Sequence, residues 1–261
     1  MKKIFEWIGG FALIAFSFYF TDQVSLLVAN KSSLMEEIKM VNAEYRMDAI
    51  DAVINPEDNT IIPGKYGREV NNNESYLSMH EFGVFNENYL VFSYIKPRTS
   101  LEDNKDKYII EGNSANRQIS LIVDDNKAIA NYLDDKKIIY NVIAKSEEDL
   151  KSKTIEYING ASTKEDFKSL NSKISNNKKI CIKDYSELNS CVKYNYYIIQ
   201  PALVLQLSNI VDLKNRISSG TIILISTNAK LEHLKIILNE INYKDLEIVS
   251  ISSLIDEKKA K

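Results

Sequence analysis

The stretch of sequence that decides the fold reads Ile119-Ser-Leu-Ile-Val-Asp-Asp125. A short apolar run that ends in two carboxylates is typical of a buried parallel strand whose carboxyl end carries polar side chains. From Gln118 to the C-terminus, apolar runs of this kind alternate with amphipathic segments. This alternation predicts an α/β fold with a mostly parallel sheet built from βα units.

The predicted elements fill residues 118–261. Strands are expected at 119–123, 138–144, 179–182, 196–199, 221–226 and 246–249, and helices at 127–133, 147–158, 164–174, 208–217 and 231–241. Ser146 with Asp149, and Thr163 with Asp166, have the spacing of a capping box that opens a helix. A full eight-unit barrel takes about 250 residues, so we expect either an open doubly wound sheet or a reduced, distorted (β/α) barrel.

The N-terminal residues have the pattern of a membrane anchor. Lys2 and Lys3 precede an apolar run at residues 4–20 whose only charge is Glu6. Its length is at the short limit for a membrane-spanning helix. A cleaved signal peptide and a buried amphipathic helix are the alternatives, but the run ends in aromatic residues where a signal peptidase requires small ones. We predict an uncleaved single-pass anchor in residues 1–30, with a cytoplasmic N-terminus and an extracytoplasmic C-terminal domain at the cell membrane.

Two segments are predicted between this anchor and the α/β domain at 118–261. In residues 31–55, apolar side chains recur every three or four positions, which indicates a juxtamembrane helix that ends before Pro56. Its heptad pattern is too short for a coiled coil, so a spacer docked on the domain is favoured. Residues 56–117 carry turn signals and short strand-like runs at 89–94 and 107–110, which predict a small accessory segment.

Composition narrows the class of function. Of 261 residues, 44% are hydrophobic and 26% are charged, with 8 Gly and 4 Pro, which excludes a disordered or collagen-like chain. The 33 Lys and Arg against 36 Asp and Glu leave a net charge of -3, which argues against nucleic acid as a partner. The chain has only two His and two Cys. Most hydrolytic metal sites and nucleophile relays need more of these side chains close together.

Asp124 and Asp125 are candidate site residues because they follow the strand expected at 119–123. Adjacent carboxylates there can hold a hard cation or share acid and base roles. They can equally cap the following helix, and both interpretations stay open. His80 and His233 are interpreted as helix-surface or hydrogen-bonded side chains, because no His-x3-His spacing occurs.

The two cysteines, Cys181 and Cys191, allow two interpretations. They can form a disulfide, or they can be separate buried positions on a strand and a helix. The sequence contains no GxGxxG, Walker A, GxSxG or HExxH motif, so nothing indicates the chemistry that those motifs carry.

Taken together, these segments resemble the polysaccharide deacetylase (NodB homology) family, in particular membrane-anchored members from low-GC Gram-positive bacteria. The resemblance covers roughly residues 61–261. Ile119-Ser-Leu-Ile-Val-Asp-Asp125 is similar to the family's first strand with its Asp-Asp motif, and Gly220-Thr-Ile-Ile-Leu-Ile225 is similar to a closing strand. The Asp pair also resembles that of response-regulator receiver domains, but Asp184 lies farther along the chain than their phosphoacceptor.

The resemblance implies a catalytic site that this sequence keeps only in part. In the family the first Asp is the base, and the second Asp and two His of a His-x3-His motif hold a metal that activates water against an acetamido group. A further His is the acid. By position, Asp124 is the vestigial base candidate and Asp125 the vestigial metal-ligand candidate. Residues 157–170, where the His pair is expected, contain no His, and Ser226 and Thr227 stand where the acid is expected.

We therefore expect a membrane-anchored, extracytoplasmic deacetylase-like protein that has lost catalysis and binds carbohydrate or scaffolds the cell envelope. Its expected partners are a cell-wall glycan or an envelope protein, with no cofactor. The alternative is a weakly active peptidoglycan deacetylase, in which Asp124 and Asp125 hold zinc, nickel or cobalt with help from Asp184 or His233. A third hypothesis is a partner-binding domain without a glycan role. Because one carboxylate pair cannot fill a three-ligand site, the first hypothesis is favoured.

Overall fold

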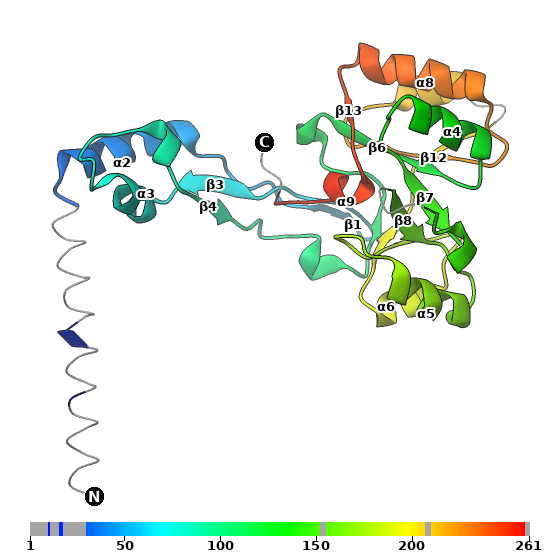
Figure 1. The fold of residues 1–261 in the computed structure, drawn as a ribbon, viewed down its shortest axis with the longest axis horizontal. Helices are drawn as coiled ribbons and strands as arrows, with labels where there is room; N and C mark the ends of the chain where they lie inside the picture. The colour runs from blue at the N-terminus through cyan, green and yellow to red at the C-terminus, as the bar shows by residue number, and fades with distance from the viewer. Residues whose placement is uncertain (1–9, 11–15, 18–29, 152–154, 207–209, 259–261) are drawn as a thin grey trace, which may run out of the picture. The chain divides into compact units, whose positions relative to one another are not determined.

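A computed structural model of the chain describes residues 10, 16–17, 30–151, 155–206 and 210–258 (Figure 1). The chain divides into two compact units. The smaller comprises Met1–Asp48 and Gly67–Ile95, and the larger comprises Ala49–Tyr66 and Lys96–Lys261. The accessory segment expected at 56–117 therefore contributes to both units.

The larger unit is built on one sheet of eleven strands, in the order β1-β2-β5-β10-β9-β8-β7-β6-β12-β11, with β13 paired to β6. All of its described pairings are parallel except that of β1 with β2. The strands are β1 (Val53–Asn55), β2 (Thr60–Ile62), β5 (Tyr108–Ile109), β6 (Gln118–Val123), β7 (Asn141–Ala144), β8 (Glu156–Asn159), β9 (Ile180–Ile182), β10 (Tyr197–Ile199), β11 (Leu203–Leu205), β12 (Ile222–Ile225) and β13 (Glu247–Ile248). The predicted mostly parallel sheet is confirmed, and its open order is that of a curled, incomplete barrel.

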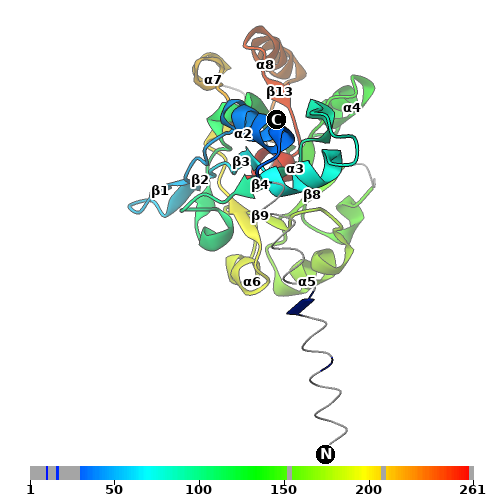
Figure 2. The ribbon, with the colours of Figure 1, turned by 90° about the vertical axis from the view of Figure 1, so that its left-hand side faces the viewer.

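Helices cover both faces of this sheet. They are α4 (Lys127–Asp135), α5 (Lys164–Lys173), α6 (Leu188–Lys193), α7 (Ile210–Arg216), α8 (Leu231–Tyr243) and α9 (Ile251–Leu254). Short 3-10 turns lie at η2 (Glu102–Asn104), η3 (Ser114–Asn116) and η4 (Glu147–Asp149). Helices α5 and α6 lie together, apart from α8 (Figures 1 and 2).

The alternation of side chains along β6 shows how the core is divided. Leu121 and Val123 belong to the apolar cluster under α4, α7 and α8, whereas Ile122 belongs to the cluster that contains α9. A third cluster packs α5 and α6 against the neighbouring strands. Since successive strand residues point to opposite faces, the sheet is buried on both sides, as a parallel sheet requires.

One predicted helix is wrong. Residues 147–158 form η4 followed by β8, rather than a helix. The capping box of Ser146 and Asp149 is present, but it opens a single 3-10 turn. Tyr157, Ile158 and Asn159 are buried in β8 between β7 and β9, so tertiary packing overrides the helical periodicity. The sequence also does not predict β11, whereas Thr163 caps α5 as expected.

The smaller unit contains α2 (Ser33–Tyr45), α3 (Asn72–Met79), η1 (Glu87–Tyr89) and an antiparallel pair, β3 (Gly67–Val70) with β4 (Phe92–Ile95). Its core is formed by Leu34, Ile38, Val70 and Met79. The helix predicted across residues 31–55 ends earlier, at Tyr45. After that point the chain is extended beside β3. The backbone of Met47 exchanges two 2.8 Å hydrogen bonds with that of Arg68 in β3.

The prediction of a single-pass membrane protein is corrected. In the part of the chain that the structure describes, no helix is long and apolar enough to cross a membrane. Its longest helices, α2 and α8, have 13 residues each, whereas a spanning helix needs about 20. Most of residues 4–20, where the anchor was expected, lie outside the described residues.

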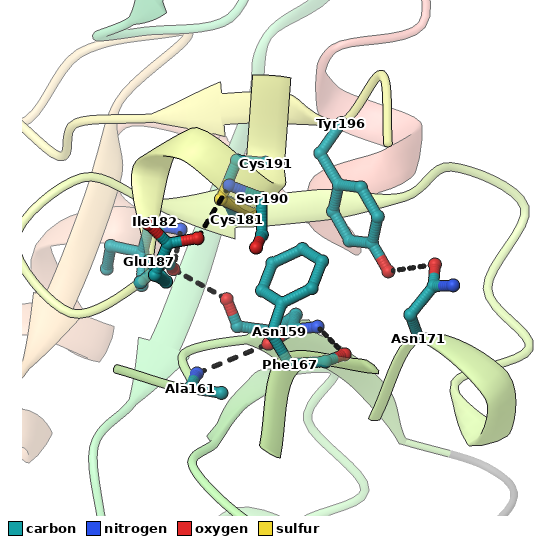
Figure 3. The surroundings of a disulfide bond; sticks show 11 residues. Asn159, Ala161, Phe167, Asn171, Cys181, Ile182, Glu187, Ser190, Cys191 and Tyr196 are labelled. Carbon is teal, nitrogen blue, oxygen red and sulfur yellow. Dashed lines mark hydrogen bonds between the residues drawn. A yellow bond between two sulfur atoms is a disulfide. The ribbon is translucent and has the colours of Figure 1, made fainter. Parts of the chain in front are cut away.

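Cys181 on β9 and Cys191 on α6 form a disulfide (Figure 3). Of the two interpretations that the sequence allows, the structure therefore has the bonded one, and both residues are also fully buried. The disulfide lies beside Phe167 of α5, whose ring centroid is 5.1 Å from that of Tyr196. The disulfide links α6 covalently to β9 inside this apolar cluster.

Replacing both cysteines with alanine is expected to lower the free energy of unfolding by about 2–3 kcal/mol, because the short loop between them is no longer closed in the unfolded chain. Urea denaturation measures this loss. Dithiothreitol should produce a similar loss in the wild-type chain and none in the Cys181→Ala, Cys191→Ala variant. A wild-type chain whose unfolding is unchanged by the reductant would contradict the assignment.

Candidate functional site

The candidate site lies at the carboxyl ends of β6, β7 and β9, where parallel strands of this fold class place functional residues. Asp124 follows β6 and is 6% exposed. Its Oδ1 lies 2.7 Å from the Nζ of Lys145, which follows β7. Its Oδ2 accepts a 2.9 Å hydrogen bond from the hydroxyl of Tyr185, in the loop after β9. Oδ2 is therefore hydrogen-bonded, whereas the buried Oδ1 has the ion pair with Lys145 but accepts no hydrogen bond from the described residues.

The turn after β7 holds Lys145 in place. Its backbone N–H donates to Oδ2 of Asp149 at 2.7 Å, and the N–H of Ser146 donates to the same oxygen at 3.0 Å. The ammonium of Lys145 also lies 5.3 Å from the centroid of the Tyr185 ring, which adds a favourable cation–π contact. The capping box thus positions the cation that pairs with Asp124.

Tyr185 donates to Asp124 as a neutral phenol. Burial of the ring, and then the hydrogen bond and charge of Asp124, raise the pKa of Tyr185 to about 12. At neutral pH its proton therefore stays on the phenol. The ring packs against the apolar cluster around α9, so the hydroxyl is directed by packing as well as by the hydrogen bond.

Asp125 has different surroundings. It is exposed, its φ is 39°, and it lines a 380 Å³ cavity beside α4. The helix cap is Asn126, whose Oδ1 accepts from the N–H of Ile129 at 3.2 Å. Neither Asp therefore caps the helix through its side chain. The carboxylate of Asp124 is held in the strand-end site, whereas that of Asp125 belongs to the cavity.

The segment after β8, where the family resemblance places a His pair, has a structural role instead. A Cβ on Gly160 would lie 2.2 Å from Cγ2 of Ile143, so the backbone passes too close for a side chain. The buried amide of Asn159 donates to the carbonyl of Phe167 at 3.3 Å and accepts from the N–H of Ala161 at 3.2 Å (Figure 3). These bonds close the turn between β8 and α5.

Hydrogen bonds also hold the loop at the end of β12, where an acid His was expected. The hydroxyl of Ser226 donates to the carbonyl of Leu205 at 2.8 Å. The side-chain amide of Asn126 donates to the carbonyls of Thr227 and Ala229 at 3.2 and 3.1 Å. The polar groups at this strand end hold the loop and offer no proton donor of suitable pKa.

The other candidate residues do not join Asp124. His80 caps α3 in the smaller unit, with Nδ1 2.7 Å from the carbonyl of Leu77. His233 lies on α8, and Asp184 is an exposed residue after β9. Among the described residues, no group of three or more His, Cys, Asp or Glu side chains could hold a metal ion. The metal implied by the family resemblance therefore does not fit the residues present.

Lys145 and Tyr185 are site residues that the sequence pattern does not predict. A usable signal existed for Lys145, since it directly follows the strand predicted at 138–144, as Asp124 follows its own strand. Tyr185 lies three positions beyond β9, so only the folded loop brings it to Asp124.

No family model matches the chain. It is 32% identical over 97 residues to the uncharacterized protein YlxY of Bacillus subtilis (strain 168). That match covers 37% of this chain and 30% of YlxY, so the chain spans less than a third of this relative.

Solved structures match more of the chain. One is BA3943 of Bacillus anthracis, described as a CE4 family pseudoenzyme, with a TM-score of 0.57 and 18% identity over 88% of this chain and 97% of that one. A mutant of it has a TM-score of 0.58 and 18% identity over 88% of this chain and all of that one. A further mutant, described as having restored enzymatic activity, has a TM-score of 0.57 and 19% identity over 87% and 99% of the two chains. This chain therefore has the fold of a CE4 family pseudoenzyme.

Lys145→Met is expected to lower the free energy of unfolding by about 1–3 kcal/mol at neutral pH, because Asp124 then stays buried without its counter-charge. In the Asp124→Asn, Lys145→Met double variant the loss should be smaller than the sum of the single losses. A double-mutant cycle by urea denaturation measures this coupling. Strictly additive losses would show that the two side chains do not interact.

The raised pKa of Tyr185 predicts a pH dependence of stability. The native state holds this proton more tightly than the unfolded chain, so unfolding releases it between about pH 10 and pH 12. The contribution of protonated Tyr185 to the free energy of unfolding is complete below about pH 10 and is lost as the pH rises through this window. Tyr185→Phe should therefore flatten the alkaline decline in the free energy of unfolding. Equal slopes for the variant and the wild-type chain would contradict the contact.

Proposed function

We propose that this chain is a catalytically degenerate polysaccharide deacetylase-like protein that binds carbohydrate or scaffolds the cell envelope. Membership of the polysaccharide deacetylase family is part of the proposal. Its expected partners are a cell-wall glycan or an envelope protein.

One observation carries the loss of catalysis. Asp124, the residue that would act as the base, has an ammonium 2.7 Å from one oxygen and a phenol hydroxyl 2.9 Å from the other. A general base must reach the proton that it abstracts. Here Oδ2 already accepts the hydrogen bond of Tyr185, and the ammonium of Lys145 lies against Oδ1. Without a Lewis acid, water keeps a pKa near its bulk value and is a poor nucleophile.

The retention of the fold supports a binding role. The strand ends of this fold present polar groups such as Lys145 and the hydroxyl of Tyr185, which can hydrogen-bond a glycan without catalysis. BA3943, which has this fold, is itself described as a pseudoenzyme. Fold similarity alone does not assign a function, so the proposal depends on the arrangement around Asp124.

The purified full-length chain, dialysed against zinc, nickel or cobalt, tests the loss of catalysis. We expect less than stoichiometric metal by mass spectrometry and no acetate released from N-acetylated chitooligosaccharides or peptidoglycan. One metal ion per chain, lost in Asp125→Ala and accompanied by acetate release, would instead establish the weakly active deacetylase.

Retention on insoluble peptidoglycan tests the binding role. The full-length chain should sediment with purified peptidoglycan and be released by soluble cell-wall fragments. If the chain stays in the supernatant, glycan binding is contradicted, and a domain that binds only protein partners becomes the favoured hypothesis.

A further inference from the structure

A cavity of 380 Å³ lies on the α4 side of the sheet, outside the Asp124 contact. Its lining includes apolar side chains, among them Val142 of β7 and Ala130 of α4. The described part of the β7–β8 connection, residues 145–151 and 155, contains η4 and no α-helix. The volume is in the usual range for small-molecule sites, about 300–1,000 Å³.

Two buried tyrosines, Tyr140 and Tyr157, are among the residues that line this cavity. The hydroxyl of Tyr140 donates to Oδ1 of Asp134 at 3.0 Å. The hydroxyl of Tyr157 accepts from the backbone N–H of Lys151 at 2.9 Å. Both hydroxyls are therefore held in place. Tyr140 is 5% exposed and Tyr157 is 6% exposed, so each contributes only a small, ordered part of the cavity lining.

The charged groups around the cavity balance. Three ammonium groups and three carboxylates line it, from Lys127, Lys145, Lys151, Asp125, Asp134 and Asp149. This balance favours neither an anion nor a cation as ligand. Together with the amide of Asn131, these side chains add hydrogen-bond donors and acceptors to the apolar residues of the lining.

We propose that this cavity binds a pyranose ring of an uncharged glycan. A pyranose offers an apolar face for apolar lining residues such as Val142 and Ala130, and equatorial hydroxyls that both donate to and accept from the charged and amide side chains of the lining. The inference rests on the carbohydrate-binding role proposed above and gives that role a location, with Asp125 at its edge. Lys145 touches both regions, since its ammonium pairs with Asp124 while the residue also lines the cavity.

Two matched substitutions on α4 test this site in the full-length chain. Ala130 lines the cavity, whereas Ala128 is exposed on the same helix and does not. Isothermal titration with triacetylchitotriose, and with cellotriose as a neutral probe without acetamido groups, compares Ala130→Phe with Ala128→Phe. We expect Ala130→Phe to abolish binding by filling the cavity, and Ala128→Phe to bind as the wild-type chain does.

Asn131→Ala gives a second measurement at an exposed position that is not expected to affect folding. Loss of its amide should weaken binding by about three- to tenfold, the effect of one hydrogen bond. Equal affinity in all three variants and the wild-type chain would overturn the site, as would a wild-type chain that binds neither trisaccharide at millimolar concentration. Either result can be told apart from failure of the proposed function, because metal content, acetate release and peptidoglycan sedimentation are measured separately.

Discussion

The buried carboxylate of Asp124, at the carboxyl end of β6, requires an opposite charge. The ammonium of Lys145, 2.7 Å from Oδ1, provides it. Burying an unpaired charge is strongly unfavourable, so this ion pair fixes how the loops after β6 and β7 meet. The hydroxyl of Tyr185 adds the loop after β9. The geometry of the candidate site follows from this single requirement.

The ion pair between Asp124 and Lys145 also supports the proposed loss of metal-dependent catalysis. In the family that the sequence resembles, a divalent metal supplies positive charge at this end of the sheet. Here Lys145 supplies it, with the turn capped by Asp149 holding the lysine in place. An ammonium neutralises a carboxylate but does not acidify water as a coordinated metal does.

The sequence predicts most of the parallel sheet, because runs such as 119–123 and 221–226 are short, apolar and followed by polar residues. It fails at 147–158, where a capping box and helical spacing agree locally but β8 is needed between β7 and β9. The site is predicted only in part. Asp124 follows its strand and is found from the pattern, whereas Tyr185 reaches it through a loop whose path depends on packing.

The disulfide is likewise not predicted by the sequence, because the spacing of Cys181 and Cys191 allows them to be either bonded or separate. Only the placement of α6 against β9 brings the two sulfur atoms together.

Diffraction data collected at the zinc absorption edge, from crystals soaked in millimolar zinc, would show directly whether Asp124 holds a metal. We expect no anomalous peak at Asp124, with the ammonium of Lys145 within ion-pair distance of Oδ1. A zinc ion bound to Asp124, with Lys145 displaced from the carboxylate, would contradict this expectation.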